Sequence, residues 1–122
     1  MISELQAKFK FLSTDPHILG IIFYGSFATK QNHAKSDIDI CIVAGKSSKY
    51  PLYKKIMAGF PEDISNYDIR FFEELPLLIR GKIIEEGVVL YTPDMGKLTE
   101  YFFFSTRKEL EEYRFRISHL NY

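Results

Sequence analysis

The sequence has few of the residues that mark several common protein classes. Its single cysteine, Cys41, excludes an intramolecular disulfide and a zinc site built from cysteines. No stretch approaches the roughly 20 consecutive apolar residues that a membrane-spanning helix needs. Residues 1–8 lack the basic start and the apolar core of a signal peptide. We therefore expect a soluble, cytoplasmic protein that does not enter a membrane.

Neither sign of charge is in surplus. Lysine and arginine together number 16, and so do aspartate and glutamate. No overall field draws the chain toward nucleic acid or an acidic membrane surface, so direct binding to either is not expected. Aromatic residues, in contrast, make up 16% of the chain, although tryptophan is absent.

Length and composition indicate one domain. The 122 residues are 46% hydrophobic, which is enough for one compact core and too little chain for two. No repeat, linker or low-complexity segment marks a boundary. We therefore treat residues 1–122 as a single domain.

Hydrophobic patterning predicts an α/β (α+β) fold. Apolar or alternating runs predict strands at about 18–24, 37–43, 66–72 and 88–91. Helical spacing and helix-initiating residues predict helices at about 2–13, 26–32, 50–58, 73–87 and 95–119. We expect a small mixed β-sheet with helices packed on one side and the functional site along an exposed sheet edge.

The residues best suited to chemistry lie around the first two predicted strands. The first strand ends at Gly25 and Ser26, a turn whose backbone N–H groups and hydroxyl can hold a polyphosphate. Asp37 and Asp39 follow on the second strand, where side chains two residues apart share a face. Two such carboxylates form a site for a hard divalent cation such as Mg²⁺.

A third carboxylate, Asp68, interrupts the otherwise β-prone third strand. On a strand beside the other two, it can ligate a metal and orient or deprotonate an attacking hydroxyl. Asp63 lies close by in the sequence, and a shift of the strand would transfer the role to it. Phosphate-binding turn, metal ligands and base together indicate nucleotidyl or phosphoryl transfer.

The same residues carry a family resemblance. The pattern Gly25-Ser26-x-Ala28, followed by Ser36–Ile40, resembles the signature of the DNA polymerase β-type nucleotidyltransferase superfamily. The segments that narrow the resemblance follow Asp68 and are Leu75–Arg80, Ile83–Gly87 and Val89–Tyr91. Over a core of about residues 15–95, the chain resembles the minimal nucleotidyltransferases (MNT), the antitoxins of HEPN–MNT toxin–antitoxin modules.

The resemblance implies an activity and a partner. Minimal nucleotidyltransferases of this kind transfer AMP from Mg-ATP to a tyrosine of the HEPN toxin, an RNase, and so silence it. A hetero-oligomer with such a toxin is therefore expected, with ATP as substrate and two Mg²⁺ ions as cofactors. By the same resemblance, Asp37 and Asp39 hold the ions, and Asp68 completes the triad and activates the acceptor hydroxyl.

For the nucleotide, the resemblance implies that Gly25 and Ser26 hold the β- and γ-phosphates. The chain departs from many relatives just after this turn. They have a basic residue followed by glycine where this sequence has Thr29 and Lys30. Lys30 can replace the missing contact as a point charge on phosphate, so we include it among the nucleotide-binding residues.

Two other functions compete with this one. A nucleotidyltransferase that modifies a small hydroxylated molecule, such as an aminoglycoside, would use the same carboxylates but needs a helical domain or subunit to hold its acceptor. An antitoxin that only blocks its toxin sterically would leave the carboxylates without a role.

The predicted C-terminal helix carries a further signal. Its Tyr101–Phe104 segment is apolar around too wide an arc for an ordinary amphipathic helix. Either part of it is exposed to a protein partner, or the core is larger here than elsewhere.

Overall fold

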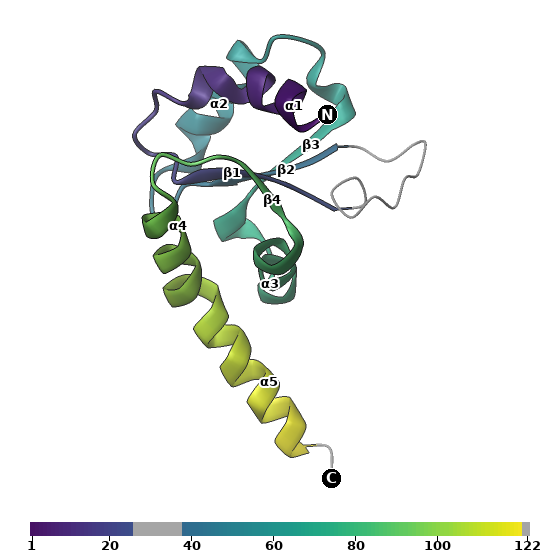
Figure 1. Cartoon of the computed structure of the whole chain (residues 1–122), viewed down its shortest axis with the longest axis vertical. Coiled ribbons are helices and arrows are strands. Elements are labelled where there is room, and N and C mark those ends of the chain that lie inside the picture. The colour runs from purple at the N-terminus through teal and green to yellow at the C-terminus, as the bar shows by residue number, and fades with distance from the viewer. Residues whose placement is uncertain (26–37, 121–122) are drawn as a thin grey trace.

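Four apolar segments form one mixed β-sheet. The structure, a computed structural model, describes residues 1–25 and 38–120 (Figure 1). The strands are β1 (Gly20–Tyr24), β2 (Ile38–Val43), β3 (Tyr67–Phe71) and β4 (Val88–Tyr91). Their order is β3-β2-β1-β4, in which β1 is antiparallel to both neighbours and β2 is parallel to β3. The predicted α+β class, the mixed sheet and the four strands are confirmed, with strand ends within two residues of the prediction.

Helices cover both faces of this sheet. Around it lie α1 (Ile2–Phe9), α2 (Lys49–Gly59), α3 (Leu77–Glu86), α4 (Met95–Phe102) and α5 (Lys108–Leu120). In Figure 1, α1 and α2 lie over one face, and α3 and α4 lie over the other. The expectation that helices pack on one side is therefore wrong.

The strands themselves explain the two-sided cover. In β2, Ile40 and Ile42 belong to a core cluster with α1 and α2, whereas Cys41 and Val43 belong to a second cluster with α3 and α4. All four side chains are buried. A strand that is apolar on both faces is stable only when both faces are covered.

The sequence predicted a single helix over 95–119. In the structure, a π-helical turn over Phe103–Arg107 separates α4 from α5, so the segment is not one regular helix. Arg80 of α3 stabilises this turn: its Nη1 donates to the Ser105 carbonyl at 3.2 Å and to Thr106 Oγ1 at 3.3 Å. The Arg80 side chain is thus tied to the neighbouring helix and is not simply solvated. Beyond this contact, α5 extends away from the rest of the molecule (Figure 1).

The predicted helix at 26–32 lies outside the described residues. None of the helices in the described part of the chain is long and apolar enough to cross a membrane.

Candidate active site

The structure brings Asp39 and Asp68 together on neighbouring strands. Their Cα atoms are direct partners in the parallel β2–β3 register, and such partners are about 4.8 Å apart. Asp39 has the same position parity as Cys41, so both carboxylates lie on the face that α3 and α4 partly cover. Two aspartates that the sequence placed on separate strands therefore form one acidic site.

The end of β1 completes the same row. Tyr24 is the Cα partner of Asp39 across the antiparallel β1–β2 pair, so three adjacent strands align Tyr24, Asp39 and Asp68. Burial is the main cause that raises the pKa of the half-buried Tyr24 phenol, and the nearby negative groups, including both carboxylates, raise it further. Tyr24 is therefore a protonated, neutral side chain at neutral pH, beside two acids.

Gly25 lies directly against Asp39. A Cβ atom built on Gly25 would be 2.1 Å from Asp39 Oδ2, and the backbone φ of +80° falls in the left-handed region. Both facts favour glycine, since a methyl group would displace the Asp39 carboxylate and the conformation disfavours any side chain. The turn predicted to hold phosphate thus begins in contact with a predicted metal ligand.

The choice between Asp68 and Asp63 is resolved by the strand boundaries. Asp63 precedes a short 3-10 turn (Ile64–Asn66), and its Oδ1 accepts the Ser65 backbone N–H at 2.9 Å. It is not part of β3. Asp68 is the strand residue in register with Asp39, as the sequence analysis favoured.

Arg70 is a site residue that the sequence analysis missed. Its Nε donates to Asp68 Oδ1 at 2.8 Å, and this hydrogen bond raises the pKa of the Arg70 guanidinium. Strand alternation could have found it, because a residue two positions after Asp68 shares its face. The guanidinium partly neutralises the acidic site from the sheet edge.

Cys41 is buried beneath the site, and its pKa is raised, first by burial and then by the Glu73 carboxylate. A buried thiol with a raised pKa is an unreactive packing residue.

Three of the predicted site residues, Ser26, Lys30 and Asp37, lie outside the described residues. Within residues 1–25 and 38–120, no group of three His, Cys, Asp or Glu side chains could hold a metal. The described part of the chain therefore contains two of the three predicted metal ligands, Asp39 and Asp68, and one of the predicted phosphate-binding residues, Gly25.

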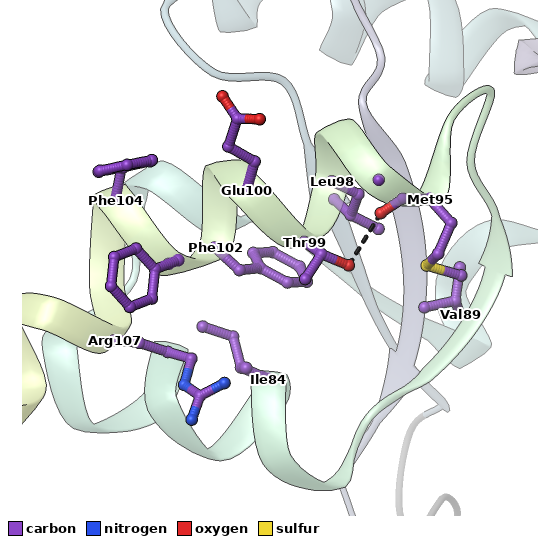
Figure 2. A pocket seen from close by; sticks show the side chains of 11 residues that line it. Ile84, Val89, Met95, Leu98, Thr99, Glu100, Phe102, Phe104 and Arg107 are labelled. Carbon is purple, nitrogen blue, oxygen red and sulfur yellow. Dashed lines mark hydrogen bonds between the residues drawn. The ribbon is translucent and has the colours of Figure 1, made fainter.

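A cavity of about 640 Å³ lies elsewhere in the molecule, where α4 and its π-helical turn face Ile84 of α3 and Val89 of β4 (Figure 2). Its lining is mainly apolar and includes Ile84, Met95, Phe102 and Phe104. Neither Asp39 nor Asp68 lines it. The cavity is therefore separate from the acidic site.

Carboxylates on adjacent strands of a mixed sheet, beside a glycine with positive φ, are the arrangement expected of a nucleotidyltransferase. The model of the family "Polymerase beta, Nucleotidyltransferase" matches residues 8–95 of this chain. The chain therefore belongs to the polymerase beta nucleotidyltransferase family, which confirms the resemblance drawn from the sequence.

Individual relatives agree with this assignment. A protein of Methanocaldococcus jannaschii, provisionally named a protein adenylyltransferase, is 36% identical over 86 residues, which are 70% of this chain and 65% of the relative.

Among solved structures, a chain of a toxin–antitoxin complex with AMP-PNP matches with a TM-score of 0.67 at 19% identity, covering 94% of both chains. A chain of the complex between tri-AMPylated Shewanella oneidensis HEPN toxin and MNT antitoxin matches with a TM-score of 0.65 at 17% identity, covering 98% of this chain and 95% of the other. At these identities the two structures show a shared fold.

Proposed function

We propose that this protein transfers AMP from Mg-ATP to a tyrosine of a partner HEPN toxin and so acts as its antitoxin. The observation that carries the proposal is the register of β2 and β3, which sets Asp39 beside Asp68 under the Gly25 turn. An enzyme that joins a nucleotide to a hydroxyl needs these groups together: acidic oxygens, a base, and backbone that approaches closely to phosphate.

The donor set fits magnesium. Two carboxylates in register supply oxygen ligands, the type that Mg²⁺ prefers, and leave positions for water and substrate phosphates. Asp37, which precedes Asp39 by two residues in the sequence, would be a further ligand. When bound, the metal supplies charge that stabilises the phosphate oxygens during transfer.

The chain's own residues have distinct roles in this proposal. Gly25 and Ser26 bind the β- and γ-phosphates through the turn, with Lys30 as an additional cation. Asp68 accepts the proton of the acceptor tyrosine, whose oxygen attacks the α-phosphorus. A bond forms between that oxygen and phosphorus, the bond to the β-phosphate oxygen breaks, and pyrophosphate leaves with the electron pair.

Arg70 contacts this base. Its guanidinium donates to Asp68 Oδ1, and Asp68 Oδ2 takes no part in this hydrogen bond. Asp68 is thereby oriented from the sheet edge, where an acceptor on another chain would approach.

The name of one relative and the composition of two solved complexes support the proposed tyrosine acceptor and the proposed toxin partner. The M. jannaschii relative is provisionally named a protein adenylyltransferase. The two solved complexes contain, respectively, an ATP analogue and an AMPylated HEPN toxin bound to an MNT antitoxin.

The test is a transfer assay with ATP labelled at the α-phosphate, Mg²⁺ and the product of the neighbouring gene as acceptor. The wild-type chain should label a tyrosine of that product. Asp39→Asn and Asp68→Asn should each reduce labelling by at least about a hundredfold, the order expected for a lost general base or ligand. Asp63→Asn is the matched control and should retain labelling, because Asp63 lies off the strand.

Metal binding gives a second readout. Mn²⁺ binding, measured by calorimetry, should weaken in Asp39→Asn and remain in Asp63→Asn. Two results together would refute the transferase: the wild type transfers no label, and the Asp39→Asn protein still neutralises the toxin. They would show an antitoxin that acts by steric binding.

A further inference from the structure

The outer part of α5 has no cover within the described chain. Every residue from 111 to 120 is exposed, and α5 projects from the body in Figure 1. Yet this segment carries large apolar side chains at Tyr113, Ile117 and Leu120, which are 36%, 41% and 76% exposed. A projecting helix with such residues gains little stability from its own chain.

These residues continue a seam that is already used inside the molecule. Leu110 is buried against Gly81 of α3. Leu110, Tyr113, Ile117 and Leu120 follow the alternating three- and four-residue spacing of a helix that packs against another helix. We refer to these four residues as the α5 stripe. Only its first member is buried by the described residues.

The two flanks of the α5 stripe differ. On one flank, Arg114 contacts Glu85 of α3 at 3.5 Å, so α3 lies on that side. On the other flank, Glu109 and Arg116 are both exposed, and neither forms an ion pair with a residue in the described ranges. At about 100° per residue, these two side chains point in nearly the same direction, about two turns apart.

This free flank carries an acid, Glu109, and a base, Arg116, two turns later. When two copies of α5 run antiparallel, the acid of each copy faces the base of the other. We propose that the α5 stripe packs against the α5 stripe of a second copy of this chain, antiparallel, with Glu109 facing the second copy's Arg116. A two-fold axis then forms both ion pairs at once, and two-fold dimers are the commonest oligomers. In a parallel pair, Glu109 would instead face the other flank of the second copy, where Arg114 already contacts Glu85.

The apolar residues place the two-fold axis within about one residue of the same point. The midpoint between Glu109 and Arg116 lies next to Tyr113, and so does the midpoint between Leu110 and Ile117. One axis near Tyr113 therefore pairs Glu109 with Arg116, sets Leu110 opposite Ile117 and stacks the two Tyr113 side chains. This agreement between charge and apolar spacing favours a second copy over an unrelated helix, for which the chain's own charges need not match one another.

The experiment measures the mass of the full chain by light scattering across a concentration series. The wild type should approach twice its 14.3 kDa as concentration rises. Glu109→Arg and Arg116→Glu should each weaken the dimer at least tenfold, because each sets like charges against each other. An equimolar mixture of the two variants should restore it, since both mixed pairs then join opposite charges.

Glu111→Arg is the matched control: it makes the same charge change on a different side of α5 and should leave the dimer intact. Circular dichroism of each variant checks that the fold is retained. A wild type that stays monomeric up to about 0.3 mM, a range in which even weak complexes form, would overturn the inference. So would a mixture that fails to restore the dimer, or a monomer whose α5 stripe binds the neighbouring gene's product instead. The inference is independent of the proposed transfer of AMP, and its mass readout remains valid if that transfer is not found.

Discussion

At the scale of single residues, the acidic site depends on Gly25 as much as on the acids. The positive φ and the near contact with Asp39 are separate reasons for glycine, and each has a different consequence when it is removed. Strain in the backbone lowers folding stability, whereas displacement of the Asp39 carboxylate disrupts the site. A second glycine with positive φ, Gly45, allows the two effects to be separated, because a Cβ there would meet only Leu19 Cδ1 at an ordinary 3.4 Å.

We predict that Gly25→Ala and Gly45→Ala each lose about 1 kcal/mol of folding free energy or somewhat more, from the left-handed backbone. Only Gly25→Ala should also lose Mn²⁺ binding and AMP transfer, because its methyl group would overlap Asp39 Oδ2. Urea unfolding and calorimetry measure the two effects. Full metal binding by Gly25→Ala would contradict the contact that we describe.

At the scale of elements, Glu73 connects the end of β2 to α4. Its carboxylate accepts the Ala44 and Gly45 backbone N–H groups at 3.3 Å and 2.9 Å, and the Tyr101 hydroxyl at 2.7 Å. Lys49 Nζ lies 3.6 Å from the same carboxylate. Burial first, and the hydrogen bond to Glu73 second, raise the pKa of Tyr101, so its hydroxyl stays a donor at neutral pH.

The aromatic segment at 101–104 is partly core and partly surface, since Phe102 is buried and Phe104 is exposed.

We expect Tyr101→Phe to lower the free energy of unfolding by about 1–2 kcal/mol, because a hydrogen bond to a partly buried carboxylate is lost. Tyr50→Phe removes a hydroxyl from a residue that is 69% exposed and should change stability by less than about 0.5 kcal/mol. Urea denaturation of both variants gives the comparison. Equal stability of the two variants would mean that Glu73 does not anchor α4.

At the scale of the whole molecule, the sheet separates two hydrophobic cores. Side-chain hydrogen bonds connect the surrounding loops and helices to one another. Asp15, in the turn before β1, is one such link: its Oδ1 accepts the His17 backbone N–H at 2.9 Å, and its Oδ2 accepts from Lys55 of α2 at 3.2 Å. Burial alone would raise the pKa of Asp15, but the hydrogen bonds from His17 and Lys55 outweigh it, so the pKa is lowered.

Asp15 should therefore make stability depend on pH in acid. A carboxyl whose pKa is lower in the folded state contributes stability that is fully present above its unfolded pKa of about 3.9 and is lost as pH falls through the folded value. Thermal unfolding between pH 2 and pH 6 should show a smaller acid-side loss in Asp15→Asn than in the wild type. Lys55→Met should reduce the same loss in part, and an unchanged pH profile in Asp15→Asn would exclude this linkage.

The sequence by itself determined the four strands and the candidate chemistry. Strand periodicity and apolar runs are local properties, so all four strands, and the placement of Asp39 and Asp68 on separate strands, could be read from neighbouring residues. Motif spacing likewise predicted the family. Ser26, Lys30 and Asp37 remain predictions, because they lie outside the described residues.

Only the tertiary structure decided what meets across the chain. The parallel register that sets Asp39 beside Asp68, the Arg70 contact and the helices on both sheet faces depend on how distant segments pack, which local patterning does not specify. The break between α4 and α5 has the same origin, because Arg80 of α3 stabilises the π-helical turn from outside it. Local sequence patterns indicate which element each side chain belongs to, whereas long-range packing determines which side chains it contacts.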